Sequence, residues 1–167
     1  MNSMKPQIQL ACQQDIPSLV RLLTACANHM YQQGMTHWLG VYDEQSVRQN
    51  LLQKTVYILK QDSHVSGCVA LGIQPADYYA DCWPDVPVAD FYLTQLAVHP
   101  QHQQSGYGRL LLQHCLELIN GRTLQLDAVA HYPELLAFYR KAGFSEIAEG
   151  IGLGDRRYLF EYGNSTQ

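Results

Sequence analysis

Two hydrophobic patterns divide this chain into short strands and helices. Alternating or continuous apolar positions predict strands at residues 7–11, 55–60, 65–73, 93–98, 123–129 and 156–162. Apolar positions three and four apart predict helices at residues 15–33, 43–54, 106–119 and 133–141. The residues expected to point into the core from two of these helices are Val47, Leu51, Leu52, Leu110, Leu111, Cys115 and Leu118. Strands and helices are mixed along the chain, which indicates an α/β or α+β layered fold.

Length, charge and cysteine usage narrow the class of protein. The 167 residues suit one domain over 1–167, without internal repeats or linkers. A net charge of −4 without a basic stripe argues against nucleic-acid binding. Five scattered cysteines without a C-x-x-C pair favour reduced thiols, and the isolated pair His99 and His102 does not predict a metal site. We find no signal-peptide pattern and no membrane-spanning run, so we expect a cytoplasmic protein that does not bind membranes.

A strand, a glycine loop and a helix follow one another at residues 93–112. The apolar strand stops at His99-Pro100, the loop passes through Gly106 and Gly108, and a helical pattern begins at Arg109. Glycine lets backbone approach a ligand closely, and the first turn of a helix has unpaired N–H groups, so the junction suits a phosphate. The alternative is an ordinary tight turn before a helix.

Two irregular segments are candidates for binding a substrate. Residues 35–42 are apolar but aperiodic, and their His37 and Trp38 either line a pocket or pack at the edge of the core. Residues 74–89 are aromatic, acidic and rich in proline, which predicts a long loop without regular structure. This loop is interpreted either as a lid for a cationic substrate or as a self-packed excursion or homodimer contact.

Four segments of the second half carry a resemblance to a known family. They are Leu96–Pro100, the loop Gln103-x-x-Gly106-x-Gly108, Asp127, and Pro133–Phe144 with its Phe-Tyr-x-Lys-x-Gly-Phe element. In order and spacing they resemble the GNAT superfamily of acyl-CoA-dependent N-acyltransferases across residues 93–144. The first half agrees only in its order of strands and helices. The resemblance implies a mixed central sheet of about six to seven strands with about four helices, whose middle strands splay apart.

The resemblance also implies a place for acetyl-CoA as co-substrate. Pantetheine is expected between the strands at 93–98 and 124–129, and the pyrophosphate on the N–H groups of residues 104–109. The residues expected to contact the cofactor are Leu96, Ala97, Val98, Gln103, Gln104, Ser105, Gly106, Tyr107, Gly108 and Arg109. The loop departs from the family pattern because residues 103–105 carry no Lys or Arg. Cofactor affinity is therefore expected to depend on backbone groups and Arg109.

The chemistry of acyl transfer assigns roles to a few side chains. The amine must lose a proton, the oxyanion of a tetrahedral intermediate must be stabilised, and the departing thiolate benefits from an acid. Tyr139 matches the family's tyrosine acid, with packing as an ordinary aromatic as the alternative. The strand before the glycine loop lacks the family's frequent glutamate, and Asp127 is the first choice for binding the amine or removing its proton, or else it only holds backbone. Asp90 and His131 join His37 and Trp38 as substrate-binding candidates.

These features lead to one main hypothesis and its alternatives. The main one is an N-acetyltransferase that moves the acetyl group of acetyl-CoA to a primary amine of a small molecule. One alternative has the same fold and acetylates a protein or peptide, and another binds acyl-CoA without turnover, motivated by the missing glutamate. A nucleotide-binding module is disfavoured because the loop lacks the Lys-Ser/Thr of a P-loop and the first strand lacks G-x-G-x-x-G.

Overall fold

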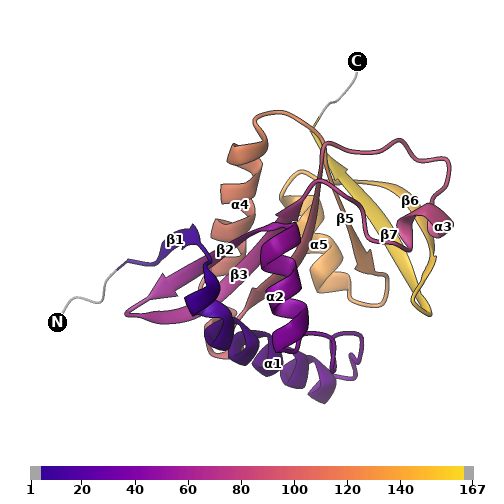
Figure 1. Cartoon of the computed structure of the whole chain (residues 1–167). Helices are drawn as coiled ribbons and strands as arrows, with labels where there is room; N and C mark the ends of the chain where they lie inside the picture. The colour runs from indigo at the N-terminus through magenta and orange to yellow at the C-terminus, as the bar shows by residue number, and fades with distance from the viewer. Residues whose placement is uncertain (1–4, 164–167) are drawn as a thin grey trace. The chain divides into compact units, whose positions relative to one another are not determined.

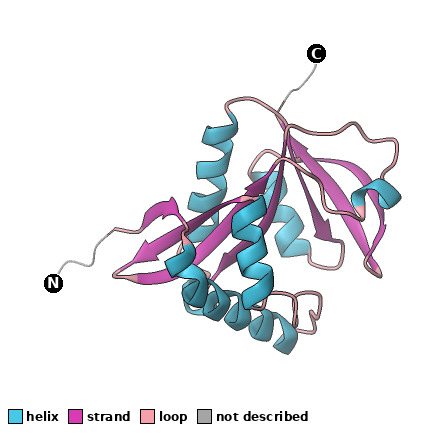
Figure 2. Cartoon of the chain, in the orientation of Figure 1, coloured by secondary structure: helices cyan, strands magenta, loops and turns pink. Residues whose placement is uncertain are grey.

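The computed structural model describes residues 5–163 as a succession of strands and helices (Figure 1). The strands are β1 (Gln7–Leu10), β2 (Thr55–Gln61), β3 (His64–Gly72), β4 (Phe91–Val98), β5 (Leu124–Val129), β6 (Ser145–Gly152) and β7 (Asp155–Tyr162). The helices are α1 (Ile16–Gln32), α2 (Glu44–Gln53), α3 (Tyr79–Cys82), α4 (Tyr107–Ile119) and α5 (Pro133–Lys141), with 3₁₀ turns η1 (Gln13–Asp15) and η2 (Pro100–His102). Figure 2 shows the alternation of helix, strand and loop. The predicted α/β class is confirmed.

The strands form one mixed sheet in the order β1-β2-β3-β4-β5-β7-β6. The pairings of β1 with β2, β2 with β3, β5 with β7 and β6 with β7 are antiparallel, whereas β4 and β5 pair in parallel. The parallel register joins Phe91 to Leu124 and Tyr92 to Gln125, at the start of both strands. The predicted splaying of these two strands stays a prediction.

Two compact units make up the described chain. The first extends to Leu71 and includes Thr94–Cys115, and the second comprises Gly72–Leu93 and the chain from Leu116 onward. In the first unit, the apolar face of α1 packs with α2 and strands β2 to β4 through Leu19, Leu23, Val47, Ile58 and Ala97. This core supports the strand and the loop at which the sequence places the cofactor.

The second unit contains a smaller aromatic cluster. Tyr79 of α3 lies 5.0 Å from the Trp83 ring and 5.8 Å from the Tyr92 ring, both in edge-to-face geometry. Leu159 of β7 and Ala89 complete the buried group. Residues 74–89, predicted to be without regular structure, therefore contain the one-turn helix α3, because buried tyrosine and tryptophan side chains hold that turn against the sheet.

Three sequence predictions about packing are wrong. Leu52, expected inside, is 75% exposed, and Leu110 and Leu118 are both 46% exposed. The buried face of α4 is formed by Leu111, Leu112, Cys115 and Ile119. Three consecutive leucines at the start of α4 leave the orientation of the helix open to a periodicity argument, and packing selects the face one residue further along.

Strand β6 was not predicted as a separate strand. It lies at the edge of the sheet, and seven of its eight residues are exposed or half-buried, so it lacks an apolar alternation. By contrast, the strands predicted at residues 55–60 and 65–73 are present as β2 and β3, and a tight turn joins them. Asp62 and Ser63 occupy it with φ of 52° and 71°, the left-handed geometry that two-residue hairpin turns require.

Candidate active site

The glycine loop lies between the 3₁₀ turn η2 and helix α4 and presents backbone to solvent. Gly106 has φ of +85°, and a Cβ built there meets no atom within 4 Å. The first intrahelical bond of α4 runs from the Leu110 N–H to the Gly106 carbonyl at 3.1 Å. The N–H groups of Tyr107 and Gly108 precede that bond and have no acceptor within the helix. The first turn of α4 has no acidic residue, so the junction fits an anionic group.

Side chains within the loop stabilise its shape. The Ser105 backbone N–H and hydroxyl both donate to the His102 carbonyl, and the Gln103 amide donates to the Val98 carbonyl at 3.3 Å. Tyr107 is buried, and its hydroxyl bonds the Gln61 side chain at the end of β2. The side chains of Gln103, Ser105 and Tyr107 thus bond other groups of the chain, whereas the Gln104 and Arg109 side chains are exposed. Their contact with a cofactor stays a prediction.

Strand β4, which precedes the loop, has an unusual backbone at Gln95. This residue has φ of 60° inside a strand, where a non-glycine residue is strained. Its side chain is 4% exposed and accepts a 2.6 Å bond from the Asn50 amide of α2, while its carbonyl accepts a 3.4 Å bond from the Cys68 thiol. Beyond it, Ala97 is buried, and Leu96 and Val98 are half-buried.

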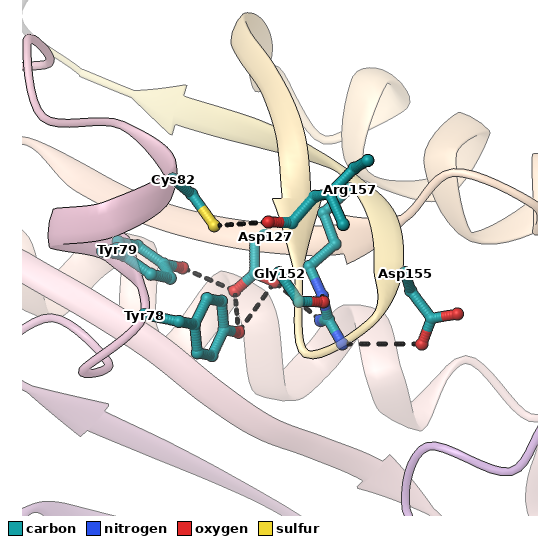
Figure 3. A network of polar contacts seen from close by, with 8 residues as sticks. Tyr78, Tyr79, Cys82, Asp127, Gly152, Asp155 and Arg157 are labelled. Atoms are coloured by element: carbon teal, nitrogen blue, oxygen red, sulfur yellow. Dashed lines mark hydrogen bonds and ion pairs between the residues drawn. The ribbon is translucent and has the colours of Figure 1, made fainter.

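In the second unit, a buried polar group gathers around Asp127 of β5. Figure 3 shows the Asp127 network, which comprises Tyr78, Tyr79, Asp127 and Arg157. The Tyr78 hydroxyl lies 2.9 Å from both carboxylate oxygens, the Tyr79 hydroxyl donates at 2.6 Å, and Arg157 Nη1 donates at 2.9 Å. The Arg157 and Asp127 side chains are each 8% exposed. Burial and the carboxylate raise the pKa of both tyrosines, so both remain neutral donors.

This arrangement does not favour the catalytic assignment of Asp127. Both oxygens already accept bonds from groups of this chain, and one of them is also paired with the Arg157 guanidinium at 2.9 Å. A base that removes a proton from an amine needs a free lone pair directed at the substrate. Asp127 instead connects the α3 segment to β5 and β7. This agrees with the alternative of a structural role, although its partners are side chains and not backbone.

Sequence reasoning missed Arg157 as the partner of Asp127. A usable signal was present, because Arg157 shares its face of β7 with the buried Leu159, and an arginine on an inward face requires a carboxylate. The Arg157 Nε also donates to the Gly152 carbonyl at 2.7 Å (Figure 3). Cys82 of α3 donates its thiol hydrogen to the Ile151 carbonyl at 3.0 Å. The α3 segment is therefore attached to the β6–β7 hairpin as well.

Tyr139 lies in α5 at 6% exposure. Its ring is 5.8 Å from those of Phe144 and Phe160 and 5.3 Å from that of Phe138. Burial, with a smaller contribution from Asp127, raises the pKa of Tyr139, so its phenol is neutral near pH 7 and keeps a proton to donate. The ring packing suits either role that the sequence left open, and the role as an acid stays a prediction.

The remaining substrate candidates have separate surroundings. Asp90 accepts bonds from the Thr123 N–H and hydroxyl, both at 3.0 Å, and these bonds lower its pKa. It joins the start of β4 to the residue before β5, which gives it a structural function that the sequence did not suggest. His131 is exposed in the turn between β5 and α5.

His37 and Trp38 lie on the connector between α1 and α2. Trp38 packs against the core of the first unit and lies edge-on to Tyr42 at 5.2 Å. It also lines a pocket of about 290 Å³ with Val20, Leu23 and Asp43. Trp38 therefore both lines a pocket and packs at the edge of the core. Its contact with a substrate stays a prediction.

A family comparison explains this combination of elements. Residues 53–146, more than half of the chain, match the model of the acetyltransferase (GNAT) domain. The chain belongs to the GNAT acetyltransferase family. The matched range includes β4, the glycine loop, Asp127 and Tyr139. A stretch of 78 residues is also 28% identical to the mouse (Mus musculus) cysteine-rich protein 2-binding protein. That stretch is 47% of this chain, which spans about a tenth of the mouse protein's length.

Solved structures share the fold at low sequence identity. A GNAT-family acetyltransferase from Streptococcus agalactiae aligns over 99% of each chain with a TM-score of 0.83 and 15% identity. The ribosomal-protein-S18-alanine N-acetyltransferase from Escherichia coli aligns over 98% of this chain and 96% of its own, with a TM-score of 0.71 and 17% identity. PaiA N-acetyltransferase from Thermoplasma acidophilum, solved with coenzyme A, aligns over 96% and 99%, with a TM-score of 0.74 and 15% identity. The predicted GNAT resemblance is confirmed.

Within residues 5–163, no helix is both long and apolar enough to cross a membrane. The same residues contain no group of three or more His, Cys, Asp or Glu that could hold a metal ion.

Proposed function

We propose that this acetyltransferase moves the acetyl group of acetyl-CoA to a primary amine of a small molecule. The observation that supports this most directly is the glycine loop, where Gly106 is left-handed and exposed and the first turn of α4 offers unpaired N–H groups. An anionic pyrophosphate fits there because no acidic side chain lies in that turn. Arg109, exposed in the same turn, adds the positive charge that residues 103–105 lack.

Acetyl-CoA would supply an activated thioester, and the protein would orient it and handle protons. The backbone of Leu96–Val98 is the candidate for polarising the thioester carbonyl, since a backbone N–H donor costs no reorganisation during the reaction. Tyr139 would donate to the departing thiolate, and its raised pKa keeps the hydroxyl protonated for that purpose. We assign no side chain to removal of the amine's proton.

Cofactor binding can be tested with two arginines at opposite ends of α4. Arg109 lies in the first turn of α4 and Arg122 lies three residues after its end, and both are exposed. We expect Arg109→Met to weaken acetyl-CoA binding about tenfold in isothermal titration calorimetry, the value of one charge-assisted contact. Arg122→Met should leave the affinity unchanged. A wild-type protein without any heat signal or thermal shift on addition of acetyl-CoA would refute the proposed function.

Turnover and acceptor class need a second experiment. We expect a panel of small amines to yield free CoA thiol, and we expect Tyr139→Phe to lower kcat about 100-fold while leaving acetyl-CoA affinity unchanged. Acetylation of peptide amino termini or lysines alone would identify the protein-directed alternative. Binding of acetyl-CoA without turnover of any acceptor would identify the non-catalytic one.

A further inference from the structure

A lysine without an acidic partner lies beside β4. Lys54 follows the last residue of α2, and its Nζ donates to the Thr94 hydroxyl of β4 at 3.1 Å. None of the ion pairs formed by the described residues involves Lys54. Burial lowers the pKa of Lys54. An ammonium in such a place has lost part of its hydration and has received only one neutral acceptor in return.

The backbone next to this lysine is held rigidly. Thr94 directly precedes Gln95, whose left-handed conformation is fixed by the 2.6 Å bond from Asn50. Asn50 lies one helical turn before Lys54, and the Lys54 N–H donates to the Asn50 carbonyl at 2.8 Å. The side chains of Asn50 in α2 and of Lys54, the residue after α2, thus contact consecutive residues of β4. A strained residue that is fixed from two elements is a frequent feature of ligand sites.

The position of Lys54 along β4 separates it from the glycine loop. Within β4, Thr94 is the first residue that belongs to the first unit. Val98 is the last residue of the strand and leads to the loop. Four residues of strand correspond to about 13 Å. The phosphates proposed for the loop therefore have a different place, and Lys54 faces the other end of the strand segment that is proposed to hold the thioester. Along this segment, the alternate residues Thr94, Leu96 and Val98 are all half-buried.

We infer that Lys54 and Thr94 bind the carboxylate of the acceptor, which makes the substrate an amino acid. A carboxylate would supply the missing counter-charge and accept from both the ammonium and the hydroxyl. This inference rests on the proposed function, because it assigns the acceptor of the same reaction. It accounts for a half-buried cation for which the described residues supply no carboxylate.

The test compares L-amino acids with their carboxamides as acceptors, with acetyl-CoA as donor. The wild type should acetylate the preferred amino acid with kcat/KM at least tenfold above that of its carboxamide. Lys54→Met should remove this preference by raising KM for the amino acid, with little change for the carboxamide. Lys54→Arg should retain part of the preference because it keeps the charge. Arg48→Met, which removes an exposed cation from α2, should leave the ratio of the two kcat/KM values unchanged.

A binding measurement makes the outcome independent of catalytic rate. Each amino acid is titrated into protein saturated with CoA, and the rise in melting temperature is compared between wild type and Lys54→Met. A rise that the variant loses supports the inference. An unchanged carboxylate preference in Lys54→Met, a loss of acetyl-CoA affinity instead, or no response to any amino acid in either assay overturns it. In each of these cases acetyl-CoA binding by the wild type tells whether the proposed function survives.

Discussion

Replacing Asp127 by Asn tests whether this carboxylate holds the second unit together. The substitution keeps the side-chain volume but removes the negative charge from a site that is 8% exposed. Arg157 then retains its hydrogen bond to the Gly152 carbonyl at 2.7 Å and its more distant ion pair with the Asp155 carboxylate at 3.9 Å. Tyr78 and Tyr79 lose a charged acceptor. The variant therefore leaves a buried guanidinium without its main partner.

The expected cost follows from the burial of this pair. Removing one partner of a buried ion pair destabilises a protein by about 3–5 kcal/mol, because the other charge stays desolvated. Asn still accepts from a tyrosine, so we expect the lower end, about 3 kcal/mol. That corresponds to a decrease of roughly 150-fold in the folding equilibrium constant. Asp90→Asn, at an exposed aspartate, provides the matched control and should cost much less.

Urea unfolding followed by tryptophan fluorescence measures this difference, since Trp83 packs against Tyr79 of the network. The double variant Asp127→Asn with Arg157→Met completes a mutant cycle. Because it removes both charges, its loss of stability should be smaller than the sum of the two single losses by more than about 1 kcal/mol. A loss below about 1 kcal/mol for Asp127→Asn, or additive effects in the cycle, would show that the network does not stabilise the fold in this way.

Three further outcomes are expected. Gly67→Ala should lower stability by about 1–3 kcal/mol in urea unfolding, because its Cβ would lie 3.1 Å from the immobile Ala97 carbonyl; an unchanged midpoint would contradict this close approach. Burial raises the pKa of Asp15, but the Cys12 N–H and Lys60 together lower it by more, so the pKa lies below its ordinary value of 3.8. Its contribution is thus present above pH 3.8 and lost as pH falls through the folded-state pKa, so Asp15→Asn should be less stable at pH 7 and converge on wild type in acid; a gap that persists in acid would contradict this. Native protein should react rapidly with Ellman's reagent at exposed Cys12, whereas burial raises the pKa of three thiols to about 12 and should protect them until urea unfolds the chain; fast reaction of these three would refute their burial. The protected thiols are those of Cys26, Cys68 and Cys115.

The sequence predicted most elements because local patterns determine them. The helix predicted at residues 43–54 is an example, since the Asp43 carboxylate accepts a 2.8 Å bond from the Ser46 N–H at the start of α2. The helix predicted at residues 15–33 is another, since it is followed by Gly34, whose φ of +88° is typical of the residue after a helix end. Such features depend on neighbours within four residues, so the order of residues alone reveals them. The exposed edge strand β6 was not predicted for the opposite reason: its pairing with β7, and not its own sequence pattern, makes it a strand.

Site geometry was less accessible to sequence reasoning because it depends on residues far apart in the chain. The glycine loop could be located, since its turn and helix are local. The bonds of Asp127 to Tyr78 and Arg157 span 49 and 30 residues, and only folding brings these residues together. The same holds for Lys54 and Thr94, which are 40 residues apart. An unpaired lysine at the end of a helix looks like any solvated cation until its neighbours are known.

The placement of β7 between β5 and β6 has a consequence for protein synthesis. Residues 155–162 form an interior strand that pairs on both sides, so β5 and β6 have no shared partner until these residues have left the ribosome. The same strand delivers Arg157, and the α3 segment, made some 75 residues earlier, must wait for it. A nascent chain that stalls before residue 155 would leave the backbone edge of β5 that pairs with β7 without a partner, and such an edge can pair with another chain.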